Sequence, residues 1–285
     1  MIVSGRENGV SSARGGFDDG NLDQKEFSNP ILEAVVTEIQ KQMMATFLSL
    51  RVGVGIIGIV FPLLLWGGGK IAGFHLADSM SAYYHATRDC IEPKRPEPEA
   101  PCASDPPPTG RGPMRNWFVG ILFVIGVCLY LIKGFSKWEN LLLTIAGLLA
   151  VCVAIFPMPW TKGEVTGFPK HYVSAVTFFI LIAFVCMFCS GKTLKYMPDI
   201  PNREKTIARY RRLYRGLATS MAVSPIAAYL FNEFTFQKRL AFWAEAFGIW
   251  AFGTYWLVKT KELRLSDVER RALRGEVDIN ISALR

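Results

Sequence analysis

Four residues whose side chains can take part in catalysis or metal binding recur at helical spacing near position 80. Asp78, Ser81, His85 and Asp89 are separated by steps of three, four and four residues. If this stretch forms an α-helix, those steps place all four side chains on one face. His85 could then act as a general base that an acidic neighbour orients. His85, Ser81 and Asp89 are the candidate catalytic residues.

A second set of polar side chains is expected at the same level of the protein. His171 and Ser174 lie one turn apart at the start of an apolar run, and Glu245 lies inside another such run. A carboxylate at that depth is costly in lipid, so we expect it to face the interior and to have a partner. The expected partners are His85, His171 and Arg115. The predicted binding residues are Glu245, His171, Ser174, Arg115 and Asp78.

Two histidines and a carboxylate also form a donor set suited to zinc. The metal could keep one coordination position open for water and lower the pKa of that water toward 7. The predicted ligands are His85, His171 and Glu245. The chain contains no HExxH, GxSxG or P-loop sequence, so no strong catalytic motif supports an enzyme. Structural roles explain the same stretch: Asp78 and Ser79 as helix caps, His85 and Asp89 as solvated residues at a membrane surface.

Long apolar helices are the elements that must position these residues. The chain is 51% hydrophobic and its mean hydropathy is +0.24. Its apolar residues are concentrated in runs of the length that crosses a bilayer, which is about 20 residues for about 30 Å. We predict an all-α, polytopic membrane helix bundle of about six spans, with an outer interfacial or re-entrant helix at 71–87. The predicted spans are 47–67, 117–133, 140–157, 171–190, 213–231 and 240–258.

The polar segments complete the expected organisation. Residues 1–30 are predicted to be a mobile cytoplasmic arm, 31–46 an amphipathic lead-in helix, 47–258 the bundle with its outer loop at 70–115, and 259–285 a cytoplasmic tail. Arg51, at the start of the first span, is expected to extend toward lipid headgroups. Ser266 and Glu269 have capping-box spacing, which predicts a short surface helix in the tail.

The basic residues indicate orientation in a membrane. The formal net charge is +8, and the connection at 191–216 holds eight Lys or Arg against two acids. Short basic loops stay in the cytoplasm, which places both termini inside and the 70–115 loop outside. The expected location is a bacterial inner membrane. Bilayer lipids, with anionic headgroups at the basic inner loops, are the expected partners, and nucleic acid is not.

Two cysteines lie in the predicted outer loop. Cys90 and Cys102 flank a Pro-rich stretch. In an oxidising compartment they would form a disulfide, and the alternative is two free thiols.

Three segments resemble a group of uncharacterised bacterial multi-span membrane proteins: SMSAYYH, RNWFVGILFVIGVCLYLIKGFS and AGLLAVCVAIFP. This resemblance covers about residues 75–190 and implies a class but no activity. Ser81 and His85, in an S-x-x-x-H arrangement, are also similar to the alkaline ceramidase and progestin-receptor-like membrane hydrolases. That resemblance implies a zinc site for amide or ester hydrolysis. The chain departs from the pattern, because its last predicted span carries Glu245 in place of histidines and six spans are predicted instead of seven.

Three functions follow from this sequence. The leading one is an integral membrane protein that binds a lipid or small molecule at a polar outer-leaflet site. The alternatives are a metal- or His-dependent hydrolase acting on a lipid or amphiphile, and a structural or signalling membrane subunit.

Overall fold

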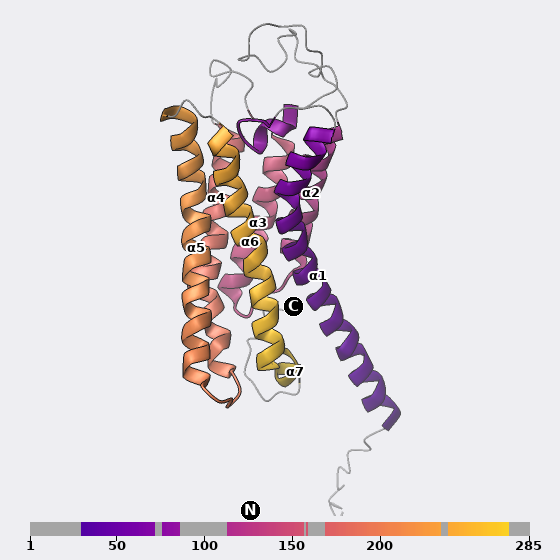
Figure 1. The fold of residues 1–285 in the computed structure, drawn as a ribbon. Coiled ribbons are helices and arrows are strands. Elements are labelled where there is room, and N and C mark those ends of the chain that lie inside the picture. The colour runs from indigo at the N-terminus through magenta and orange to yellow at the C-terminus, as the bar shows by residue number, and fades with distance from the viewer. Residues whose placement is uncertain are drawn as a thin grey trace, which may run out of the picture. The chain divides into compact units, whose positions relative to one another are not determined.

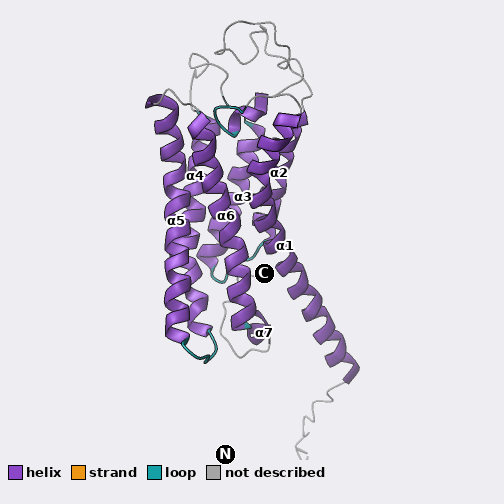
Figure 2. Cartoon of the chain, viewed as in Figure 1, coloured by secondary structure: helices purple, strands orange, loops and turns teal. Residues whose placement is uncertain are grey.

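The computed structural model describes residues 30–71, 76–85, 113–156, 158, 169–234 and 239–273. Within these residues it contains only helices and the loops between them (Figure 2). The α-helices are α1 Pro30–Ile71, α2 Pro113–Leu131, α3 Lys137–Ile155, α4 Lys170–Phe184, α5 Arg203–Phe234, α6 Arg239–Ser266 and α7 Val268–Leu273. Short helices of other types are η1 Ser81–His85, η4 Val185–Cys189 and η5 Ser190–Tyr196. The predicted all-α fold class is confirmed.

Four helical segments are long and apolar enough to cross a membrane. They are Ala34–Ile71, Met114–Leu131, Lys137–Ile155 and Lys170–Tyr196, and the mean hydropathy of an 18-residue window within each is 2.2, 1.8, 2.0 and 2.5. The chain therefore has the helices of an integral membrane protein. The other two predicted spans lie in α5 and α6, where Ser, Gly, aromatic and acidic residues lower the hydropathy.

The predicted lead-in helix and first span form one continuous helix, α1, which contains Pro62. The chain divides into two units, residues 1–40 and residues 41–285. The second unit holds most of α1 and all of the other helices, and it is the unit described below.

Helices α2 to α6 pack against one another in chain order (Figure 1). Glycines permit two of the closest approaches in the unit. A Cβ atom added to Gly126 of α2 would lie 2.7 Å from the carbonyl oxygen of Gly147 in α3, and one added to Gly253 of α6 would lie 2.7 Å from that of Gly55 in α1. Trp250 of α6 also donates a hydrogen bond of 3.0 Å to the carbonyl oxygen of Ile59. Helix α1 therefore packs against the last long helix.

Apolar side chains face outward on every long helix, including α5 and α6. Exposed examples are Ile56, Val127, Leu148, Ile180, Ile226 and Phe247. Four charged side chains of the described residues are buried, Arg51, Glu139, Lys259 and Glu262. Water-soluble proteins rarely bury charged residues or expose large contiguous apolar patches. The unit has the surface of a protein surrounded by hydrocarbon.

Candidate functional site

The described part of the stretch expected to carry the catalytic face, residues 78–85, is not an α-helix. Asp78 is exposed in a bend, and the Ser79 hydroxyl accepts a hydrogen bond of 3.1 Å from the backbone N–H of Ala82. This cap begins η1, a 3-10 helix of five residues, Ser81–His85. The prediction of one α-helical face is wrong, because a 3-10 helix has about three residues per turn and does not stack positions four apart.

Several predicted site residues fall outside the described part of the chain. Asp89, Cys90 and Cys102 lie there, and so does the side chain of His85. The catalytic residues, the disulfide and the His85 metal ligand therefore stay predictions.

Glu245 has a backbone partner at the end of the bundle that carries η1. Its carboxylate accepts a hydrogen bond of 2.6 Å from the N–H of Met80, which is buried. The sequence prediction named His85, His171 or Arg115 as the partner. Met80, the residue immediately before η1, supplies this donor from its backbone, since the N–H groups at the start of a helix have no partner within the helix.

Arg115 and Ser79 also hold the η1 segment in place. The Arg115 guanidinium donates to the Tyr84 hydroxyl at 3.0 Å and lies 4.7 Å from the centre of its ring. The Ser79 hydroxyl contacts the sulfur of Met158 at 3.7 Å. With the Glu245 contact, these interactions tie η1 to α2, to α6 and to the chain beyond α3. Glu245 and Arg115, two of the predicted binding residues, thus hold the η1 segment in place as a cap at this end of the bundle.

Tyr83 anchors the same cap through its ring. The ring is buried, with its centre 6.0 Å from that of Phe242 in α6. A Cβ atom added to Gly69 of α1 would lie 2.9 Å from the ring. Burial raises the pKa of the Tyr83 hydroxyl, because the phenolate loses its hydration there.

His171 and Ser174, two of the predicted binding residues, are both buried on α4. The His171 Nδ1 atom lies 2.8 Å from the carbonyl oxygen of Phe156 at the end of α3. Since a carbonyl oxygen only accepts, Nδ1 carries the proton of this hydrogen bond. Among the described residues, no three His, Cys, Asp or Glu side chains come close enough to hold a metal ion.

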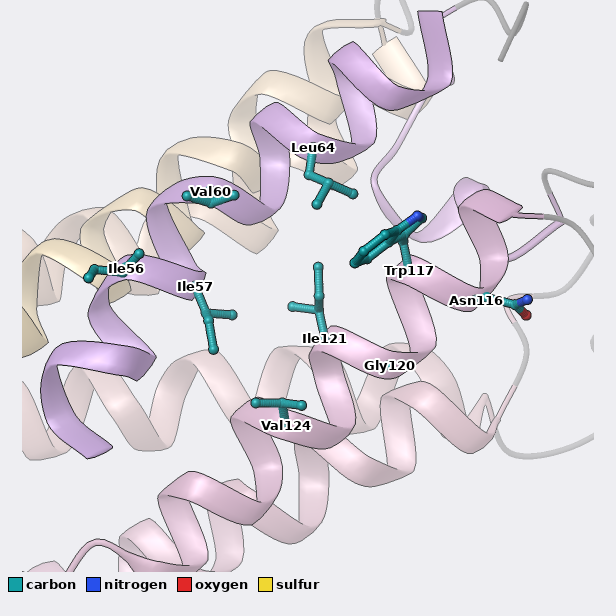
Figure 3. Close-up of a pocket in the computed structure, with 9 residues that line it drawn as sticks. All are labelled: Ile56, Ile57, Val60, Leu64, Asn116, Trp117, Gly120, Ile121 and Val124. Carbon is teal, nitrogen blue, oxygen red and sulfur yellow. The ribbon is translucent and has the colours of Figure 1, made fainter. Parts of the chain in front are cut away.

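An apolar groove of about 580 Å³ lies between α1 and α2. Figure 3 shows side chains of both helices reaching into it, with Asn116 and Trp117 toward one end. A Cβ atom added to Gly120, in its wall, would meet nothing within 4 Å. The lining residues are Ile56, Ile57, Val60, Leu64, Asn116, Trp117, Gly120, Ile121 and Val124. Sequence reasoning did not identify this groove.

A buried polar network lies at the opposite end of the bundle. The Lys259 ammonium of α6 donates to the Glu262 carboxylate at 2.7 Å, to the Thr193 hydroxyl at 2.5 Å and to the Ser190 carbonyl oxygen at 3.0 Å. Glu262 also accepts from Thr193 at 2.6 Å and from Tyr214 at 2.7 Å. Lys259 and Glu262 are only 2% and 0% exposed, so the ion pair is buried inside the protein.

Arg51 extends this network toward α7. It is 4% exposed and forms an ion pair with Glu269. Its guanidinium carbon lies 5.7 Å from the centre of the Phe135 ring, and the Lys259 nitrogen lies 5.8 Å from the same centre. The expectation that Arg51 extends to lipid headgroups is wrong, because the fold supplies a carboxylate and an aromatic ring inside the unit.

A capping box at the start of α3 holds the backbone of Phe135, whose ring contacts Arg51 and Lys259. Ser136 and Glu139 have capping-box spacing: the Ser136 hydroxyl accepts from the Glu139 N–H at 3.3 Å, and the Glu139 carboxylate accepts from the Phe135 N–H at 3.0 Å. The box predicted at Ser266 and Glu269 does not form, since Ser266 ends α6 and donates to the Leu263 carbonyl oxygen. The bundle was predicted to end at residue 258, but α6 continues to Ser266. Lys259 and Glu262 therefore lie within the bundle and not in a tail.

The comparisons leave the site to be interpreted from its own geometry. No protein-family model, curated protein or solved structure matches this chain.

Proposed function

We propose that the chain is a multi-pass membrane protein with six spans, in which α5 and α6 cross the bilayer with the four more apolar segments. Both helices are long enough, with 32 and 28 residues, and a span needs about 20. Both pack within the same bundle and expose apolar side chains, such as Ile226 and Phe247. Ser224 of α5 packs against Gly248 of α6, and Gly253 of α6 packs against Gly55 of α1, which is typical of helix contacts in membranes.

The basic residues support a cytoplasmic position for the end of the bundle that carries η5. The connection from 191 to 216 holds eight Lys or Arg, and such short basic loops stay inside. The η1 cap then lies on the outer side, and both chain ends lie inside. The resemblance to bacterial multi-span proteins supports the inner membrane of a bacterium as the location.

The proposed activity is lipid binding, with an acyl chain lying in the groove between α1 and α2. The observation that carries this proposal is the shape and chemistry of that groove. Its walls are apolar, Gly120 leaves space in one wall, and it opens sideways on helices that have the composition of membrane spans. Asn116 and Trp117, in the first turns of α2, lie toward the outer end, where polar and aromatic side chains meet lipid headgroups.

A photoreactive phospholipid tests this proposal. The full chain is reconstituted with a lipid that carries a diazirine in its acyl chain, irradiated, and mapped by peptide mass spectrometry. Labelling is expected to concentrate on residues 56–64 and 117–124, above that of equally exposed apolar residues such as Leu148 and Ile180. Labelling that follows exposure alone would contradict the proposal.

Filling the groove provides the matched variant. Gly120→Leu places a side chain in the open space and is expected to lower groove labelling several-fold. Gly216→Leu is the control, because Gly216 is also an exposed helical glycine with nothing within 4 Å of an added Cβ atom, but it lies on α5. Unchanged labelling in Gly120→Leu would reject the groove as the binding site.

A further inference from the structure

One face of α5 changes from cationic to apolar along its length. Positions spaced by three or four residues lie on the same side of an α-helix. By this spacing one side of α5 carries Arg212 and Arg215, then Gly216 and Thr219, then three apolar residues. These last residues, Val223, Ile226 and Leu230, are 50%, 58% and 47% exposed.

This face of α5 offers a ligand both exposed arginine side chains and an open position at Gly216. Arg212, Arg215, Gly216 and Thr219 are all exposed. A Cβ atom added to Gly216 would meet nothing within 4 Å. Within the described residues, neither arginine has an acidic side chain in an ion pair with it. The two guanidinium groups therefore present uncompensated positive charge beside an open position on the helix.

The distances along this face match one leaflet of a bilayer. With a rise of about 1.5 Å per residue, Gly216 and Ile226 are about 15 Å apart along the helix axis. Half of a hydrocarbon core of about 30 Å is the same length. The arginines then lie at the depth of the phosphate groups, and the apolar residues lie beside the acyl chains.

We propose that this face of α5 binds an anionic phospholipid of the inner leaflet. The phosphate lies between Arg212 and Arg215, because guanidinium groups bind phosphate through paired, charge-assisted hydrogen bonds. The glycerol region passes Gly216 and Thr219, and one acyl chain follows Val223 and Ile226. The inference rests on the membrane placement of α5 proposed above, but it concerns a different site from the groove.

Lipid retention in mixed nanodiscs tests the inference. The full chain is placed in nanodiscs of phosphatidylcholine and phosphatidylglycerol, and native mass spectrometry measures which lipids remain bound after the disc is removed. We expect phosphatidylglycerol to be enriched several-fold over its share of the disc. The double variant R212Q and R215Q is expected to lose most of that enrichment.

The matched control removes two charges from the same face of the same helix. Lys205 and Arg209 are exposed one to two turns further from the apolar segment, and the double variant K205Q and R209Q is expected to keep most of the enrichment. Equal losses in both double variants, or no enrichment in the unmodified chain, would overturn the inference. A reporter fused between α5 and α6 shows separately whether α5 still crosses the membrane, so a failed placement is distinguished from a failed lipid site.

Discussion

The Lys259 ammonium and the Glu262 carboxylate lie 2.7 Å apart, one turn from each other on α6, and neither reaches the surface. Their partners come from η5 and α5. The pair thus connects three helical segments at the proposed cytoplasmic end. Removing one partner of a buried ion pair overstates what the pair contributes to stability. The loss includes the cost of leaving the other charge buried without hydration or a counter-charge.

The first prediction concerns this pair. Lys259→Met leaves Glu262 buried without its counter-charge, and the expected loss of unfolding free energy is about 3–5 kcal/mol. Adding Glu262→Met should recover a large part of that loss. Thermal unfolding in detergent measures both, and the exposed Lys261→Met serves as the control. A double variant no more stable than Lys259→Met would contradict this view of the pair.

The second prediction concerns the contact between α2 and α3. Gly126→Ala places a Cβ atom 2.7 Å from the backbone oxygen of Gly147, so the helices must separate and the melting temperature should fall. Gly120→Ala, in the same helix, has open space and should leave the melting temperature unchanged or slightly raised, since alanine favours the helix. Equal effects of the two substitutions would show that Gly126 is not required for the close packing of α2 against Gly147.

The third prediction concerns the cap at η1. Glu245→Leu removes the acceptor for the buried Met80 N–H, and an unsatisfied donor costs about 1–3 kcal/mol. Hydrogen exchange of residues 79–84 should therefore become faster. Glu245→Gln keeps an oxygen acceptor at the same place and should show a smaller increase. If the leucine variant exchanges as slowly as the unmodified chain, Glu245 does not hold the cap.

The fourth prediction concerns α7. Glu269→Gln weakens the ion pair with Arg51, so hydrogen exchange in residues 268–273 should become faster while the long helices stay protected. Glu204→Gln, an exposed acid in the first turn of α5, provides the control. Unchanged exchange in the Glu269 variant would mean that other contacts hold α7, among them the buried Val268 and the hydrogen bond from Arg271 to the Tyr196 carbonyl oxygen.

The limits of α2 and α3 could be predicted from the sequence to within a few residues. The predicted span 117–133 corresponds to Pro113–Leu131 and 140–157 to Lys137–Ile155, whereas α6 continues past the predicted limit at 258 to Ser266. Hydropathy is a local property, so each span can be identified without knowledge of the others. The same reasoning predicted that Glu245 would have a partner, because burial of a carboxylate requires one.

The partners themselves could not be predicted. Arg51 and Glu269 are 218 positions apart, and Met80 and Glu245 are 165 apart. Which side chains meet depends on how the helices pack, and spacing along one helix does not contain that information. The Arg51 prediction failed for this reason. The predicted α-helical face failed at 78–85 for a local reason, since the Ser79 cap begins a 3-10 helix there.

The central claim is that α5 and α6 cross the membrane, since this places the groove, the cap and the α5 lipid face in the bilayer. Truncated chains fused to a reporter after Asn202 and after Phe236 test it most directly. The account predicts that a fluorescent reporter is active after Asn202 and that alkaline phosphatase is active only after Phe236. Both fusions reporting the same side of the membrane would contradict the six-span arrangement.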